Sequence, residues 1–409
     1  HTDEALTFLK WVLYACNIGL IVGAVAVAFH YGIDWAAQFR AHQPWVILFL
    51  PLGGVVIVLL YRWSGMERDR GTNLVLTAVR EAEPIRLRTA PLIFLSTILT
   101  HLVGGSAGRE GAALQLGGSI GAWVGRKIHL DEKDRRIMVM CGMSAAFSGL
   151  FGTPITAAIF AMEVVSVGVM YYAAIVPCVV SSLVSVQLAR FFGLHIGTGY
   201  LIGNVAVLGP WSMAQVCVMG VLCALLSILF CKVMHAAPKL YAKYFPNPLV
   251  RAAVGGALVL LLTLLVGEQT YNGAGDAVIR RMLAGETISE AFLLKLVFTA
   301  LTLGAGFRGG EIVPVLFTGA AFGTVVGPLL GLSQSFGGAL GMTAVFCGVT
   351  NCPMTSLFLA YELFGGQGLP LFALSCAVAY MLSGYYGLYS EQKILYSKLR
   401  PEFIDQKVK

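Results

Sequence analysis

Long apolar runs separated by short polar or glycine-rich stretches cover most of this chain. A helix needs roughly 20 residues to cross the hydrocarbon core of a membrane, and many of the runs come close to that length. Their recurrence along the whole chain predicts a protein that crosses the membrane many times. The runs lie at about 11–31, 44–61, 91–105, 110–125, 137–165, 170–191, 206–233, 250–267, 291–304, 312–333, 338–364 and 370–387.

Several runs are too short for a simple crossing, and glycine or proline interrupts others. The breaks read GGSAG, FGTP, GAGFRGG and TNCP. Unpaired backbone groups are tolerated at membrane depth only where protein or a water-filled cavity satisfies them. The pattern therefore predicts an all-α polytopic membrane protein with broken helices that stop halfway across the membrane, as in transporters.

An internal repeat divides the chain into two related halves. Residues 142–165 align without a gap on residues 341–364, 199 positions later, and nine of the 24 pairs are identical. Three glycines upstream also match three glycines of the second half, with a shift of three residues. The repeat predicts a first unit at 1–205 and a second at 206–409, with the substrate site where the two units meet.

Composition agrees with a membrane location. Hydrophobic residues make up 57% of the chain and charged residues 12%, and the mean hydropathy is +0.78. The net charge of +7 is gathered in a few polar loops, the richest at 126–136, so the positive-inside rule predicts that this loop is cytoplasmic and gives no reason to expect a nucleic-acid partner. The nine cysteines lack metal-ligand spacing, and we expect them to be buried apolar residues.

Four short segments have the composition expected of an anion site. They read RGTNLVL (70–76), GREGAALQ (108–115), GFRGGEIVP (306–314) and YGLYSEQ (386–392). Three of them are glycine-rich starts of apolar helices, where backbone N–H groups without intrahelical partners can bind a small anion. A permanent lysine or arginine charge would bind the anion more tightly and hinder its release, which conduction requires.

Glu110 opens one of these helices. An ionised carboxylate there can occupy the anion site, and a protonated one can leave it, so a single residue can couple anion passage to proton uptake. The alternative is a structural glutamate that is stabilised by the helix dipole and paired with Arg109. We favour the functional role because an ionisable group at membrane depth is a functional candidate by default.

These motifs together resemble the CLC family of anion channels and proton-coupled anion exchangers. The resemblance rests on GREG before an apolar helix, the repeated helix that ends at Glu163, the GGE stretch at 309–311 and a tyrosine near the last helix, and it covers nearly the whole chain. It implies two inverted repeats, one pore per subunit and a homodimer. It also implies that Glu110 is the gating and proton-coupling glutamate. The anion-binding residues expected on the same grounds are Thr72, Asn73, Arg109, Gly111, Ile312, Val313 and Tyr389.

Departures from the family pattern indicate which anion is carried. Chloride carriers of the family typically have GSGIP at the position of 71–75 and GxFxP at the position of 310–314, whereas this chain resembles the fluoride-transporting clade at both. Chloride exchangers also have a Glu-Glu pair where this chain has Glu163 and Val164, so the second, proton-passing glutamate is missing. The resemblance favours a fluoride/proton antiporter that exports fluoride across a bacterial inner membrane. The alternative is a chloride/proton exchanger or a chloride channel of the same family.

Fluoride is small and strongly hydrated, so a binding site must replace its water with short, strong donors. Backbone N–H groups at Glu110 and Ile312, the Tyr389 hydroxyl and the polar groups of Thr72 and Asn73 are candidates. Thr72 and Asn73 can equally be helix N-cap residues. For Glu311 we expect a structural carboxylate that accepts loop N–H bonds, with a proton-carrying or anion-site role as the alternative.

Two further expectations concern the rest of the chain. Glu163 and Glu362 occupy matching repeat positions, and a shared helix-end or packing role is favoured over a role in transport. We find no nucleophile with a base and no metal motif in the apolar runs, so we expect no enzyme activity, no metal and no cofactor. The expected partners are fluoride or chloride, protons, the lipid bilayer and a second copy of the chain.

Overall fold

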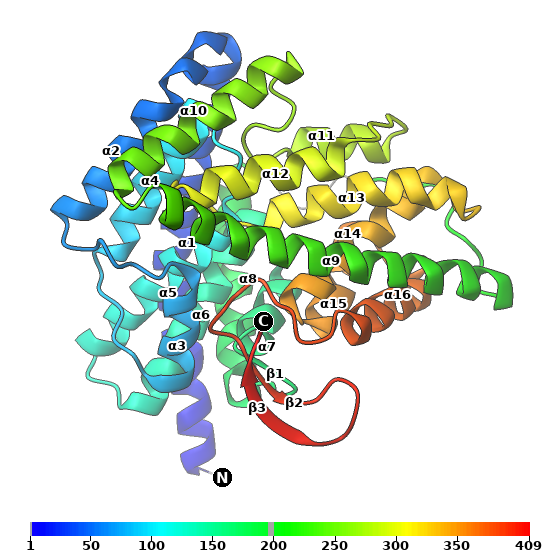
Figure 1. The fold of residues 1–409 in the computed structure, drawn as a ribbon. Helices are drawn as coiled ribbons and strands as arrows, with labels where there is room; N and C mark the ends of the chain where they lie inside the picture. Colours follow the sequence, from blue (N-terminus) through cyan, green and yellow to red (C-terminus); the bar gives the residue numbers. More distant parts are fainter. Residues whose placement is uncertain (1, 195–199) are drawn as a thin grey trace.

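The computed structural model describes residues 2–194 and 200–409 and is a bundle of long and short helices (Figure 1). Sixteen α-helices lie within the described residues. The first eight are α1 (Thr2–His42), α2 (Leu50–Trp63), α3 (Thr72–Glu81), α4 (Thr89–Val103), α5 (Glu110–Lys127), α6 (Glu132–Phe151), α7 (Pro154–Glu163) and α8 (Ile175–Phe191). The other eight are α9 (Pro210–Tyr244), α10 (Pro248–Val266), α11 (Asp276–Leu283), α12 (Ala291–Gly304), α13 (Ile312–Leu329), α14 (Gln334–Thr350), α15 (Pro353–Phe364) and α16 (Leu369–Leu382). Two 3₁₀ helices, η1 (Pro44–Phe49) and η2 (Tyr172–Ala174), precede α2 and α8.

Six helical segments of the described chain are long and apolar enough to cross a membrane. Shorter apolar helices such as α4, α7, α12 and α16 pack beside them. The prediction of a polytopic helical protein with short helices is therefore confirmed. The segments that can cross are 2–42, 44–63, 172–191, 210–244, 248–266 and 312–329.

Matching glycines pack the same helix pair in each half. A Cβ atom on Gly117 would overlap the carbonyl group of Gly142, so α5 and α6 meet backbone to backbone. A Cβ atom on Gly319 would overlap the carbonyl group of Gly341 in the same way, where α13 meets α14. Small residues let membrane helices approach this closely, which explains why these glycines recur in both halves.

The helix breaks also coincide in the two halves. The helix α6 ends at Gly152 and α14 ends at Asn351, and both residues have a left-handed backbone, with φ of +74° and +59°. A proline then occupies the first turn of the next helix, at Pro154 in α7 and Pro353 in α15. A left-handed residue ends a helix and a proline suits a helix start, so the FGTP and TNCP motifs are breaks, as predicted.

Glu163 and Glu362 connect the two halves reciprocally. The Glu163 carboxylate accepts hydrogen bonds from Met354 N (3.1 Å), Thr355 N (2.8 Å) and Thr355 Oγ1 (2.6 Å), at the start of α15. Glu362 accepts the equivalent bonds from Ile155 and Thr156 at the start of α7. Each carboxylate thus caps the repeated helix of the other half, which agrees with the helix-end role expected from the sequence.

The chain also contains a small sheet that the sequence analysis did not predict. It has the order β1-β2-β3, with β1 (Ser166–Val167), β2 (Lys393–Tyr396) and β3 (Phe403–Lys407). The strand β1 pairs with β2 in parallel, and β2 pairs with β3 antiparallel. The sheet joins the linker after α7 to the last residues of the chain, which lie beside α7 in Figure 1.

Candidate functional site: the junction of two helix starts

The loops before α5 and α13 meet in the interior of the molecule. Gly108 N–H donates to Gly310 O (2.7 Å), and Gly310 N–H donates to Gly108 O (2.8 Å). The helix α5 begins two residues after this bridge, and α13 begins at Ile312. The first turns of both helices therefore lie beside one antiparallel bridge, as two halves related by inversion would place them.

Glu110 is the first residue of α5, as the sequence predicted, and none of its surface is exposed. Its Oε2 accepts the Arg109 backbone N–H at 3.2 Å, and its Oε1 lies 3.3 Å from Arg109 Nε. The carboxylate thus turns back toward the start of its own helix, where backbone donors also serve an anion.

Arg109 faces a cavity of about 510 Å³, which we call the Arg109 cavity. Its Nη1 lies 3.6 Å from Asp34 Oδ1, so one guanidinium is shared between Asp34 and Glu110. The structure therefore separates Arg109 from Thr72, Asn73 and Tyr389, which line a different cavity. The Arg109 cavity is lined by His30, Tyr31, Asp34, Arg109, Phe151, Gly193, Leu194, Tyr200, Asp276, Ala277, Arg280 and Leu363.

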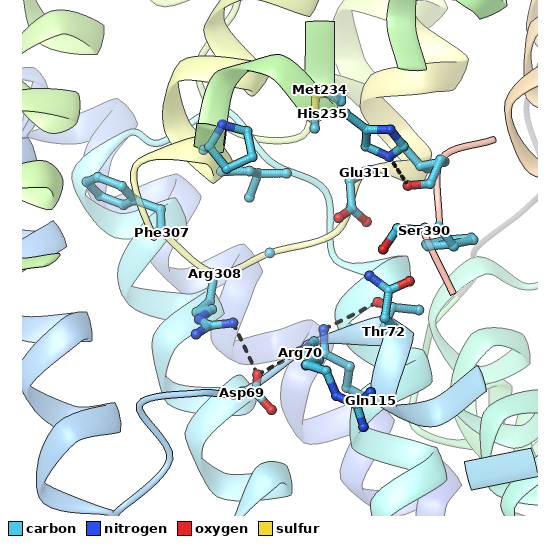
Figure 2. Close-up of a pocket in the computed structure, with 18 of the residues that line it drawn as sticks. Asp69, Arg70, Thr72, Gln115, Met234, His235, Phe307, Arg308, Glu311 and Ser390 are labelled. Atoms are coloured by element: carbon cyan, nitrogen blue, oxygen red, sulfur yellow. Dashed lines mark hydrogen bonds and ion pairs between the residues drawn. The ribbon is translucent and has the colours of Figure 1, made fainter. Parts of the chain in front are cut away.

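A second cavity of about 550 Å³ contains the start of α3, and we call it the α3 cavity. Thr72, Asn73 and Tyr389 line it, so three of the predicted residues are brought together from segments far apart in the sequence. Figure 2 shows the Glu311 carboxylate directed into this cavity, whose wall also carries Ser390. Glu110 itself is enclosed, with its neighbour Arg109 in one cavity and the loop before α13 in the other.

Thr72 is not an N-cap residue, and that alternative is wrong. The N-cap of α3 is Gly71, whose φ of +60° suits glycine, and no side chain caps the helix. The Thr72 hydroxyl donates to Gly111 O and accepts from Gln115 Nε2, both at 3.4 Å, so it connects α3 to the first turns of α5. Asn73 is not the cap either, because its Oδ1 accepts the backbone N–H of Glu391 at 3.1 Å.

The expectation that loop N–H groups bind the Glu311 carboxylate is not met. Glu311 Oε2 is buried and has no hydrogen-bond partner in the described part of the chain. A Cβ atom on Gly111 would lie only 2.9 Å from this oxygen, so Gly111 lets the carboxylate approach the first turn of α5. A buried carboxylate oxygen without a donor is costly, which favours the alternative that Glu311 belongs to the site.

Tyr389 has an equally unusual environment. Its side chain is 2% exposed, and its hydroxyl has no partner among the residues that the structure describes. Ile312 and Val313 are fully buried first residues of α13, whose N–H groups have no acceptor within the helix. The Tyr389 hydroxyl and the N–H groups in the first turn of α13 can therefore donate hydrogen bonds to an anion.

Val164 stands where the resemblance to chloride exchangers implies a second glutamate, and polar groups surround it. Val164 is fully buried, and its carbonyl oxygen accepts Gln392 Nε2 at 2.8 Å. The same amide group donates to Thr350 O, and Asn351 binds Gln392 Oε1. Lys398, in the segment between β2 and β3, binds Asn351 and Ser383, and burial lowers its pKa to about 8. Amides and an amine therefore surround the position at which a chloride exchanger has its second carboxylate.

Several polar residues of the α3 cavity were not among the predicted site residues, including Asp69, Gln115, His235 and Arg308. Asp69 Oδ2 binds Arg308 Nη1 at 3.1 Å, and His235 Nε2 bonds to Leu388 O at 2.9 Å (Figure 2). Gln115 is the one with a sequence signal, because it is a polar residue within the apolar run that begins at Glu110. Arg308 lies within the 306–314 segment but was not chosen as a site residue, and Asp69 and His235 lie in a separate loop and helix that only folding brings to it.

Two helical repeats that meet around a buried carboxylate, between two cavities, define a membrane transport protein. A family model described as voltage gated chloride channel matches residues 52–384. This chain belongs to that family, the CLC family, as its motifs predicted.

Individual relatives extend the comparison over nearly the whole chain. A chloride/fluoride channel protein of Pseudomonas syringae pv. tomato is 34% identical over 396 residues, covering 95% of this chain and 87% of the relative. The crystal structure of a CLC-type fluoride/proton antiporter is similar with a TM-score of 0.90 and 35% identity, over 94% of this chain and 98% of that one. A slow cyanobacterial Cl⁻/H⁺ antiporter has a TM-score of 0.75 at 17% identity, over 91% and 94% of the two chains, which shows a shared fold alone.

Proposed function

We propose that this protein is a proton-coupled fluoride transporter that exports fluoride in exchange for protons. The observation that carries the proposal is Glu110, a fully buried carboxylate at the first position of α5, enclosed between the Arg109 cavity and the α3 cavity. Ionised, it occupies the helix start that an anion also requires. Protonated, it loses that attraction and leaves the place to the anion, so the two ions alternate.

The α3 cavity supplies the donors for the anion. The unpartnered Tyr389 hydroxyl, the N–H groups of Ile312 and Val313 and the polar groups of Thr72 and Asn73 can replace part of its hydration shell. Glu311 adds a second carboxylate, which can hold a proton and hydrogen-bond to fluoride in that form. The site therefore suits an anion that accepts strong hydrogen bonds.

Relatives support fluoride over chloride without deciding between exchange and passive conduction. The similar structure at 35% identity is a fluoride/proton antiporter, whereas the chloride/proton antiporter shares 17% identity. The bacterial relative at 34% identity is named a chloride/fluoride channel protein. Because of that name, a channel for either halide is the second candidate. Transport measurements distinguish the channel from the exchanger.

We propose that the α3 cavity faces the cytoplasm and that the protein lies in a bacterial inner membrane. Arg136 of the basic 126–136 loop donates to Arg80 O, and Arg80 donates to Glu391 O, so the loop lies on the side of α3 and the last residues. The positive-inside rule places that side in the cytoplasm. The Arg109 cavity then opens outward and gives Glu110 its route to external protons.

We further propose that two copies pair through the face formed by α7 and α15. Glu362, in α15, is partly exposed and accepts hydrogen bonds from the start of α7, where Ile155 is 40% exposed. A carboxylate that faces lipid is costly, and a second copy of the chain would cover it. This supports the homodimer that the family resemblance implies.

The test is a flux assay on the purified protein in liposomes with an internal pH dye. With fluoride inside and none outside, fluoride efflux should acidify the lumen as protons enter, and chloride should leave much more slowly. One-to-one exchange of F⁻ for H⁺ moves two charges, so the membrane potential is held at zero. An inward proton gradient of one pH unit should then sustain roughly a tenfold fluoride gradient, because both correspond to about 1.4 kcal/mol. Fluoride efflux without proton entry would identify a channel, and equal chloride flux would refute fluoride selectivity.

A further inference from the structure

A third cavity, of about 420 Å³, lies at the end of α2 and the start of α10 and shares Arg308 with the α3 cavity. One part of its wall is apolar and is formed by Ile57, Val58 and Leu249. The other part carries three arginines, Arg62, Arg251 and Arg308, and the only carboxylate in its lining is Glu67. An apolar wall beside a cluster of guanidinium groups suits a ligand that is itself part apolar and part anionic.

The arginines keep donors for such a ligand. Arg308 stacks over the Tyr61 ring at 4.1 Å and binds Asp69 through Nη1, but its buried Nε has no partner in the described residues. Arg251 uses Nε and Nη2 for the carbonyl oxygens of Phe245 and Pro246. Guanidinium groups with unused donors match the oxygens of a phosphate group.

A third arginine stands at the rim of the cavity. Arg62 pairs with Glu67 at 3.2 Å, and both side chains are more than half exposed. A surface pair of this kind is weak and can open for a better partner. Counting Asp69 behind Arg308, three cations face two carboxylates, so the cavity retains a net positive charge.

The position of the cavity indicates which kind of molecule carries the phosphate group. The helices α2 and α9 end here, at Trp63 and Tyr244, and α10 begins here. Trp63 is 77% exposed and Tyr244 is 64% exposed, and exposed tryptophan and tyrosine at the ends of membrane helices mark the membrane–water interface. The cavity therefore lies at the level of the lipid headgroups. Basic pockets between helices at this level bind anionic headgroups.

We propose that this cavity binds an anionic phospholipid, with its phosphate on Arg62, Arg251 and Arg308 and the start of its acyl chains against Ile57 and Val58. Arg308 also lines the α3 cavity, where it holds Asp69. A lipid phosphate at Arg308 would thus contact the same side chain that shapes the mouth of the proposed anion pathway. The lipid site itself does not depend on which ion the protein transports.

The experiment is native mass spectrometry of the full chain in a mild detergent with equal amounts of phosphatidylglycerol and phosphatidylcholine. The wild type should retain phosphatidylglycerol preferentially, and the double variant Arg62→Gln/Arg251→Gln should retain about tenfold less. Val58→Phe, which keeps every charge and fills the apolar wall, should lower retention as well. The matched control is Arg86→Gln, which removes an exposed arginine from the loop between α3 and α4, outside the cavity.

Two outcomes would overturn the proposal. Equal retention of phosphatidylglycerol by the double variant, by Val58→Phe and by the Arg86→Gln control would show that the lipid binds elsewhere. Adding inorganic phosphate or glycerol phosphate tests whether the cavity binds a soluble phosphate instead of a lipid headgroup. Binding of the soluble phosphate without preferential retention of the lipid would show that the cavity takes a free anion and would refute the lipid.

Discussion

At the residue scale, the position of Glu110 in the chain accounts for the role proposed for it. A glutamate at the first position of a helix is close to the N–H groups that an anion needs, and here both of its carboxylate oxygens contact Arg109. Its arginine neighbour is shared with Asp34 on the side of the Arg109 cavity. Proton exchange and anion competition can therefore be assigned to one side chain without a relay of carboxylates.

We expect Glu110→Gln to abolish proton movement that is coupled to fluoride. Glutamine resembles glutamate in shape, but its amide group cannot bind or release a proton near neutral pH. In the liposome assay, the lumen of vesicles with this variant should change pH no more than in protein-free vesicles. Glu268→Gln alters an exposed carboxylate at the end of α10 and should behave as the wild type. Undiminished coupled transport by Glu110→Gln would exclude Glu110 from the mechanism.

Tyr389→Phe tests the phenol donor. The substitution removes one hydroxyl that has no protein partner in the described residues, so folding loses little. A hydrogen bond to a charged group is worth about 1.5–3 kcal/mol, so fluoride transport at low fluoride should slow by about tenfold or more. Tyr172→Phe, at a side chain that is 67% exposed, is the control. Equal rates for both variants would mean that the phenol does not contact the anion.

At the element scale, the two halves depend on each other through their helix caps. The starts of α7 and α15 have no capping side chain of their own half, and each is bound by a carboxylate of the other half. Two short helices, one from each half, are thereby joined to each other. The caps explain why the repeat preserves a glutamate at both positions although neither lines a described cavity.

Replacing either capping carboxylate should lower stability. Glutamine has one acceptor oxygen, and its amide group would face backbone N–H donors. We expect Glu163→Gln to destabilise by roughly 2 kcal/mol, since unsatisfied buried groups cost this order of energy. Glu362→Gln should cost less, because Glu362 is partly exposed and Glu163 is 8% exposed. Thermal unfolding in detergent, with Glu268→Gln as the reference, measures both; an unchanged midpoint for Glu163→Gln would contradict the capping role.

At the scale of the whole molecule, the α7–α15 face is the proposed contact between two copies. A bulky side chain there should separate them, so Ile155→Trp combined with Met354→Trp should convert a dimer to a monomer. Both positions are exposed in the single chain, at 40% and 44%. Leu265 lies near the end of α10 and is 73% exposed, and Leu265→Trp should leave the dimer intact. Light scattering in detergent gives the mass, and a monomeric wild type would refute the pairing.

The sequence predicted the parts of this molecule that depend on local pattern. The apolar runs, the breaks at Gly152 and Asn351 and the start of α5 at Glu110 follow from hydropathy, glycine and proline. The repeat predicted that equivalent helices pack alike. Resemblance to a known family, rather than pattern, selected Thr72 and Tyr389, and the structure brings both into one cavity.

The remaining features depend on contacts between distant segments. Asp69 and His235 have no distinctive motif, and they share a cavity with Arg308 only because the loops before α3 and α13 lie beside α9. The strand β1 has two residues, too few for an alternating pattern, and it exists because β2 pairs with it. Glu311 was assigned the wrong surroundings because a glycine-rich turn offers many N–H groups, and the sequence does not tell where they point.

The reciprocal caps also constrain the order of events during synthesis. Glu163 is made 191 residues before Met354, one of its donors. At about 5–20 residues per second, a ribosome needs roughly 10–40 s to reach that partner. During this interval the first half waits in the membrane with a carboxylate that has no helix to cap. Its hydrogen-bond donors at the start of α15 become available only when the second half is complete.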